Sequence, residues 1–212
     1  MTNKLMKTNF NPLSHGYSFP NRFEFKGLSR IVKVIKSNFI YGMCGGMVFT
    51  ALDYYFDQNK LPGFNEVDEL PLSYTKYLWK RQTQSVSISV LLKIIKFASL
   101  SISKSLQNTI QDELPKIIER LNDGLPAPIV IIRSSLFQNP THNHQVLVIG
   151  YEDYGSTMDL EIYDPNHPNL FPRLTIRQNP EYLITQSTGE PVRGFFPNKY
   201  SYQFSIAKQN SN

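Results

Sequence analysis

The chain has 212 residues, of which 41% are hydrophobic, 13% aromatic and 18% charged. This length favours a single domain, and the composition excludes a disordered polyelectrolyte and a membrane-spanning protein. The formal net charge of +5 permits a polyanionic partner, but the basic residues are scattered, so we expect no nucleic-acid binding. A single cysteine excludes an intramolecular disulfide framework and every multi-cysteine zinc or iron–sulfur site.

The N-terminal residues 1–25 are polar and show little periodicity, which predicts an irregular arm before a single domain over residues 26–212. They contain no apolar run of about 7–15 residues of the kind that directs secretion, so we expect a cytoplasmic protein unless a leaderless route exports it. The longest apolar stretch, residues 86–102, carries Lys93 and Lys96 and is shorter than the roughly 20 apolar residues that span a bilayer. We therefore expect no membrane contact.

Apolar periodicities of three and four residues predict helices in the first half of the chain. The clearest helix begins at Cys44 and ends near Asp57, and its apolar stripe consists of Met47, Val48, Ala51, Leu52 and Tyr55. Further helices are expected over residues 73–81, 87–97 and 109–121. Gly124 follows the last of these where a C-terminal cap requires a positive φ.

The second half changes to short β-branched and alternating runs, which are typical of strands. Strands are expected over residues 128–133, 144–151, 158–164, 173–177 and 200–206. Helices followed by strands, without a repeating βαβ alternation, predict an α+β fold with an antiparallel sheet.

Cys44 stands at the expected start of a helix, where free N–H groups and the helix dipole stabilise an anion and lower the thiol pKa. Gly45 and Gly46 follow it, although each glycine destabilises a helix by about 1 kcal/mol relative to alanine. They permit another backbone or a substrate to pass close by, so both are candidates for a substrate cleft. The alternative is that Cys44 is a small core residue and the glycines allow tight helix packing.

A cysteine nucleophile needs a base, and histidine is the usual one. His144 begins a strand whose alternate residues Val146 and Val148 are apolar, so its ring is expected at the end of a buried face. A structural histidine bonded to backbone is the alternative. The remaining histidines fall in the arm or in loops: His15, His142 and His167.

The strands over residues 144–151 and 158–164 are expected to form a hairpin. A turn centred on Tyr154 places His144 opposite Asp164. Opposed residues have Cβ atoms about 4.5–5.5 Å apart, which allows a carboxylate to accept a hydrogen bond from an imidazole. The same register forms two apolar pairs, Val146 with Ile162 and Val148 with Leu160. Together with Cys44, this pair predicts a thiol acyl-transfer site.

Three segments resemble the papain-like cysteine peptidases. Residues 38–46, NFIYGMCGG, resemble their nucleophile segment, and residues 143–151, NHQVLVIGY, are similar to their histidine strand. The short chain and the run Tyr163-Asp164-Pro165 look more like the bacterial C39-like branch, in which Asp is the third member.

The resemblance implies a papain-like fold, in which a helical lobe with the nucleophile helix packs on an antiparallel β-sheet lobe and the active-site cleft runs between them. It assigns Cys44 as the nucleophile, His144 as the base and then the acid, and Asp164 as the orienting carboxylate.

One position departs from this family. Six residues before the cysteine the family usually carries Gln, whose amide helps to hold the oxyanion, whereas this chain has Asn38. Asn38 and the Cys44 N–H are the expected oxyanion donors. Because asparagine is one methylene shorter, three outcomes are open: a shifted backbone, a donor from another group, or a poor site. Losing one donor typically weakens transition-state binding by about 2.7–4 kcal/mol.

The predicted activity is hydrolysis of a peptide or other amide bond through a thioester acyl-enzyme. An amine can replace water as the acceptor, so an acyltransferase resembling phytochelatin-synthase or transglutaminase-like enzymes is one alternative, and a non-catalytic binding module with the same fold is another. No metal or organic cofactor is expected, because the chain lacks a Cys/His ligand set at zinc spacing and a Gly-rich phosphate loop. His142-x-His144 is only a weak metal signal.

Other residues are candidates to line the cleft. Tyr41 and Asn143 adjoin the two motifs and are expected there. Trp79, Phe195 and Phe196 are weaker candidates, because aromatic residues at such positions are more often part of the core. Residues 189–196 are expected to form a loop over the cleft.

Overall fold

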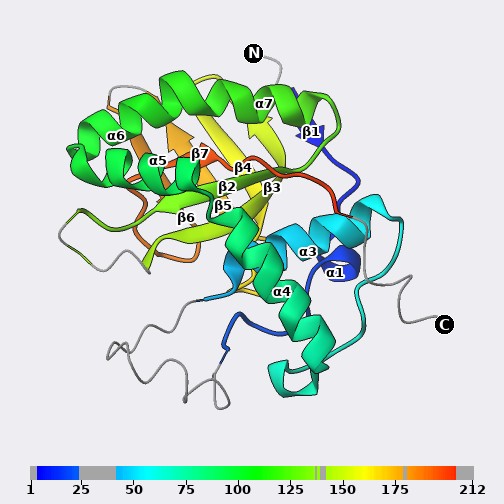
Figure 1. Ribbon diagram of the computed structural model, residues 1–212. Helices are drawn as coiled ribbons and strands as arrows, with labels where there is room; N and C mark the ends of the chain where they lie inside the picture. The colour runs from blue at the N-terminus through cyan, green and yellow to red at the C-terminus, as the bar shows by residue number, and fades with distance from the viewer. Residues whose placement is uncertain (1–3, 24–41, 137, 139–141, 179–180, 204–212) are drawn as a thin grey trace.

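The computed structural model describes residues 4–23, 42–136, 138, 142–178 and 181–203 (Figure 1). The predicted α+β class is confirmed: helices pack on an antiparallel sheet. None of the helices in this part of the chain has the length and apolar character needed to cross a bilayer.

Seven strands form one sheet over the described residues, in the order β6-β5-β4-β3-β2-β7, with β1 pairing with β3. Every pairing is antiparallel. The strands are β1 (Lys4–Lys7), β2 (Ala127–Ile132), β3 (His144–Asp153), β4 (Thr157–Tyr163), β5 (Arg173–Arg177), β6 (Leu183–Gln186) and β7 (Gly194–Pro197). β3 is the central strand, because it pairs with β1, β2 and β4. It begins with the candidate base His144.

The helices before β2 follow the predicted pattern closely. They are α1 (Pro12–His15), α3 (Cys44–Phe56), α4 (Leu72–Ser85), α5 (Ile88–Ser99), α6 (Ile102–Asn108) and α7 (Leu114–Asn122), with a 3-10 turn at Val67–Glu69 and a π turn at Thr109–Glu113. The expected helix over residues 109–121 therefore starts with the π turn. Neither α1, which lies within the expected irregular arm, nor α6 was predicted. Gly124 has a φ of 76°, as its capping position requires.

The sheet is covered on both faces, because alternate residues of a strand point to opposite sides. On one face, α7 packs through Ile117 and Leu121 against the apolar residues Ile129, Val146 and Ile162. On the other face, α3 packs on β3 and α5 packs on β2. The first of these contacts joins Val48 and Leu52 to Leu147 and Ile149, and the second joins Val90 and Phe97 to Val130 and Ile132. α4 lies against α3 (Figure 1).

Four further segments differ from the sequence predictions, and the first is β6, where no strand was expected. Within the expected irregular arm, Lys4–Lys7 forms β1; its two lysines suit an exposed edge strand and hide the strand pattern. Within the expected loop 189–196, Gly194–Pro197 forms β7, which is too short to show alternation. Residues 200–203 are not a strand, and the rest of the expected strand 200–206 lies outside the described residues.

The predicted hairpin register is wrong by two residues at Val148, which faces Ile162 rather than Leu160. The register then shifts between Val148 and Gly150, so that Tyr151 faces Leu160. The bulge lies where β1 approaches: a Cβ on Gly150 would be 2.7 Å from the Met6 carbonyl oxygen. Up to Val148 the two-residue error keeps each side chain on its predicted face. Beyond the bulge the error is three residues, so Tyr151 lies on the same face as Val148 and Leu160 and not on the opposite one.

The C-terminal described segment, residues 198–203, crosses α3 and α4 as a docked extended chain. Asn198 donates to the Gln145 side-chain oxygen at 2.8 Å, and the Tyr200 hydroxyl donates to Asp53 at 2.7 Å. Arg81 donates to the Ser201 carbonyl at 3.0 Å. This segment therefore connects β7 to the two helices that surround the candidate nucleophile.

Candidate active site

Cys44 is the first residue of α3 and is 7% exposed. The N-cap residue, Met43, provides no side-chain cap to the helix. Amide oxygens from distant segments accept two of the N–H groups instead: Asn21 accepts from Met43 and Gln82 accepts from Gly46, both at 2.7 Å. Among the described residues, the Cys44 N–H has no hydrogen-bond partner. The start of α3 is thus held in place by these two amides, and the Cys44 N–H beside the thiol is an available hydrogen-bond donor.

His144 and Asp164 form a buried pair. The His144 Nε2 lies 2.6 Å from the Asp164 Oδ1, and the two side chains are 4% and 0% exposed. Asp164 follows directly after β4, so the pair forms at a strand end and not across the ladder as predicted. Because a carboxylate only accepts, the His144 Nε2 carries the proton that points to Asp164. The His144 side chain also hydrogen-bonds with the Cys44 thiol.

Burial is the largest influence on the Cys44 thiol and by itself raises its pKa. The hydrogen bond and charge of His144, with the backbone N–H groups of Gln145 and Gly45, outweigh burial and hold the pKa below its usual value. Burial lowers the pKa of His144, but the Asp164 carboxylate and the thiol raise it to about 9. Burial alone would raise the pKa of Asp164, but His144 lowers it. The site favours a thiolate beside an imidazolium.

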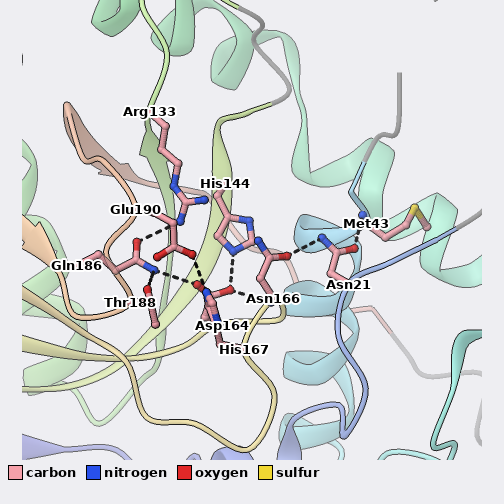
Figure 2. Close-up of polar contacts among 10 residues, drawn as sticks. All are labelled: Asn21, Met43, Arg133, His144, Asp164, Asn166, His167, Gln186, Thr188 and Glu190. Carbon is pink, nitrogen blue, oxygen red and sulfur yellow. Dashed lines mark hydrogen bonds and ion pairs between the residues drawn. The ribbon is translucent and has the colours of Figure 1, made fainter. Parts of the chain in front are cut away.

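A chain of amide hydrogen bonds connects the start of the Cys44 helix to the Asp164 carboxylate (Figure 2). Asn21 accepts from the Met43 N–H and donates from Nδ2 to the Asn166 side chain at 3.1 Å. The Asn166 N–H in turn donates to the Asp164 Oδ1 at 2.8 Å. The two halves of the site are therefore connected by neutral groups that fix their separation.

The second oxygen of Asp164 is also held. Gln186, at the end of β6, donates to the Asp164 Oδ2 at 3.2 Å, and Arg133 donates to the Gln186 Oε1 at 3.1 Å (Figure 2). Further along, the His167 Nε2 lies 2.6 Å from the Glu190 Oε1. Gln186 thus restricts rotation of the carboxylate that orients His144.

Cys44 and His144 open into a cavity of about 820 Å³. One wall is apolar and comes from α5, β2 and the end of α4: Val86, Leu91, Ile94 and Val130. The rest of the lining includes the polar residues Arg133, Asn143, Asn166 and Glu190. The cavity has room for an extended substrate segment beside the thiol.

The predicted cleft residues have different positions. Asn143 lines the cavity, and its Oδ1 accepts from the Arg133 N–H at 3.0 Å. Phe195 and Phe196 are fully buried core residues, and Trp79 is 44% exposed outside the cavity lining. Glu190 and Pro191 bring part of the expected loop 189–196 to the cavity. Asn38 and Tyr41 lie outside the described residues, so their roles stay predictions.

Gly45 and Gly46 face α4 and are not part of the cavity lining. A Cβ on Gly45 would lie 2.0 Å from the Ser85 Oγ, and a Cβ on Gly46 would lie 2.6 Å from the Leu78 carbonyl oxygen. The close backbone at Gly46 therefore belongs to α4, whereas Gly45 meets the side chains of Ser85 in α4 and Gln145 in β3. Close packing, against α4 at both positions and also against β3 at Gly45, accounts for both glycines.

Gly46→Ala is expected to reduce the free energy of unfolding by about 1–3 kcal/mol, because the α4 backbone cannot move away cheaply. This result would oppose helix propensity, which favours alanine by about 1 kcal/mol. Urea denaturation measures the change. The control is Gly63→Ala, where an added Cβ meets nothing within 4 Å and the change should stay within about 0.5 kcal/mol. Equal effects of the two substitutions would contradict the packing explanation.

Several site residues were not found from the sequence: Asn21, Gln82, Asn166 and Gln186. Each amide acquires its position from tertiary structure, and no local pattern marks it. Among the described residues, no group of three or more His, Cys, Asp or Glu side chains is arranged to hold a metal ion. Comparisons of this chain with protein-family models, with curated proteins and with solved structures find no match.

Proposed function

We propose that this protein is a cysteine-dependent hydrolase of peptide or other amide bonds, with Cys44 as nucleophile, His144 as acid and base, and Asp164 as the orienting carboxylate. The observation that carries the proposal is the buried hydrogen-bonded sequence from the thiol through His144 to Asp164. A structural core cysteine needs neither the base nor the cavity.

We assign the protein to a papain-like arrangement with aspartate as the third member, as in the C39-like branch. Three features support this assignment: a nucleophile at the start of a buried helix, a base at the start of a central antiparallel strand, and a cavity that both residues line. The residue motifs around Cys44 and His144 support it independently.

In the proposed acylation step, the Cys44 thiolate attacks the carbonyl carbon of the amide and forms a tetrahedral oxyanion. The carbon–nitrogen bond then breaks, and the His144 imidazolium gives its proton to the departing amine. In deacylation, neutral His144 takes a proton from water, whose oxygen attacks the thioester and releases the acid and the thiolate. His144 returns as imidazolium, so one water is consumed for each amide cleaved.

Alkylation by iodoacetamide across pH tests the thiolate–imidazolium pair, and the single cysteine makes the label specific. Wild-type Cys44 is expected to react rapidly at neutral pH, because its pKa lies below the usual value. In His144→Ala the groups that lower the pKa are reduced while burial remains, so the rising limb should move to higher pH. Cys44→Ala gives the background.

Hydrolysis of a peptide library measures the full reaction. Its rate should rise with ionisation of Cys44 and fall as pH increases through about 9, where His144 loses the proton that the leaving amine needs. Adding an amine acceptor and identifying the products by mass spectrometry separates hydrolysis from acyl transfer. A wild-type thiol that reacts no faster than glutathione at pH 7 would contradict the proposed function.

A further inference from the structure

The oxyanion formed in the proposed reaction needs donors aimed at the carbonyl oxygen, and two are usual. The Cys44 N–H is one donor without a partner among the described residues. Two of the side-chain amides around the cavity are already hydrogen-bonded at both ends. Asn21 uses both ends of its amide, on Met43 and Asn166, and Gln145 does the same, on Ser85 and Asn198.

Gln82 differs from these amides. It comes from α4, is half-buried and lines the cavity together with Cys44 and His144. Its Oε1 accepts from the Gly46 N–H at 2.7 Å. Because that backbone group is a donor, the oxygen must face it and the NH₂ end must be the other end of the amide. Among the described residues, this nitrogen has no hydrogen-bond partner.

The position of Gln82 is also rigid. A Cβ on Gly46 would lie 3.2 Å from both the Cβ and the backbone nitrogen of Gln82, so α4 is in close contact with the first turn of α3. The amide is thus attached at both ends: through its backbone to α4 and through Oε1 to the nucleophile turn. A donor held before the reaction stabilises developing charge without reorganising.

We propose that Gln82 supplies the side-chain donor of the oxyanion hole, with its Nε2 acting together with the Cys44 N–H. This inference rests on the proposed hydrolase function and gives the amide role to a residue of α4 in place of Asn38. Gln82 is then a catalytic residue that contacts the reacting carbonyl oxygen.

Two probes of the same thiol separate this role from a structural one. Acylation by p-nitrophenyl acetate passes through a tetrahedral oxyanion, whereas alkylation by iodoacetamide is a direct displacement that forms none. Gln82→Met removes the donor at similar volume. It should lower the acylation rate about 10²–10³-fold while alkylation at the thiolate plateau changes only a few-fold.

Gln82→Glu tests the helix cap separately, because its carboxylate still accepts from the Gly46 N–H but cannot donate. It should lose acylation at least as strongly as Gln82→Met, with both rates compared at the thiolate plateau of each variant. Gln107→Met, at a half-buried helical glutamine outside the cavity lining, is the matched control and should leave both rates unchanged. Thermal melts confirm that each variant is folded.

The outcomes are distinguishable. Wild-type acylation in Gln82→Met with rapid alkylation overturns the assignment of Gln82 and leaves the proposed function standing. Equal losses in acylation and alkylation also overturn it, since Gln82 would then only hold the nucleophile turn. A wild-type thiol that reacts slowly with both probes overturns the proposed function and this assignment together.

Discussion

Asp164→Asn is expected to lower the rate of Cys44 acylation on the order of 10²–10⁴-fold with the fold preserved. Two donors, the His144 ring and the Asn166 N–H, meet at the Asp164 Oδ1, so the amide oxygen should take that place and keep the ring oriented. The substitution therefore removes mainly the charge that raises the His144 pKa to about 9. Imidazolium, and with it the thiolate, becomes less stable.

The pH dependence identifies this cause. The falling limb of amide hydrolysis, expected near pH 9 in the wild type, should move to lower pH in Asp164→Asn because neutral Asn no longer stabilises the charged ring. The rising limb of iodoacetamide alkylation should move to higher pH. An unchanged profile with a lower maximum would instead indicate lost geometry and would contradict the charge explanation.

Arg81→Met is expected to reduce the free energy of unfolding by about 3–5 kcal/mol at pH 7. Arg81 is 1% exposed, and its Nε lies 2.8 Å from the Oδ2 of fully buried Asp53. Tyr77 donates to the same carboxylate at 2.5 Å and Tyr200 at 2.7 Å. Without Arg81, the buried Asp53 carboxylate would keep only these two hydroxyl donors, and its negative charge would be uncompensated.

Lowering the pH should reduce the loss of unfolding free energy caused by Arg81→Met. Burial is the largest influence on Asp53 and raises its pKa in the folded protein, so removing Arg81 raises it further. A folded pKa above the unfolded one means that the folded state gains stability as pH falls and Asp53 takes up its proton. Urea unfolding at several pH values measures this dependence.

Two variants complete the test of the buried pair. Adding Asp53→Asn to Arg81→Met should recover part of the loss, because no charge is then stranded. Lys7→Met, which breaks the exposed pair with Glu161, should change stability by no more than about 1 kcal/mol. If Arg81→Met behaved like Lys7→Met, the pair would not be stabilising the contact between α3 and α4.

The Cys44 helix could be predicted closely from its apolar stripe, because α3 begins at Cys44 as expected and ends within one residue of the expected position. The strand of His144 was equally clear, since both faces of β3 are buried and give an unbroken apolar run. His144 and Asp164 were expected together because a hairpin connects their strands. Two strands that are joined by a short hairpin have a relative position that can be predicted from the sequence alone.

The rest depended on contacts between distant segments. The bulge at Gly150 arises where β1 arrives, and no feature of the hairpin itself signals it. The amides of Asn21, Gln82 and Gln186 become part of the site only after three separate segments have packed. Gly45 and Gly46 were correctly expected to admit a close neighbour, but that neighbour is α4, together with Gln145 of β3 at Gly45.

The docked segment of residues 198–203 holds groups that surround Cys44. Asn198 holds Gln145, whose backbone N–H lowers the Cys44 pKa. Tyr200 donates a hydrogen bond to Asp53 of α3, which forms the ion pair with Arg81 of α4. Contacts of such long sequence separation form late. A chain in which residues 198–203 have not docked therefore lacks the contacts that hold Gln145 beside the Cys44 thiol.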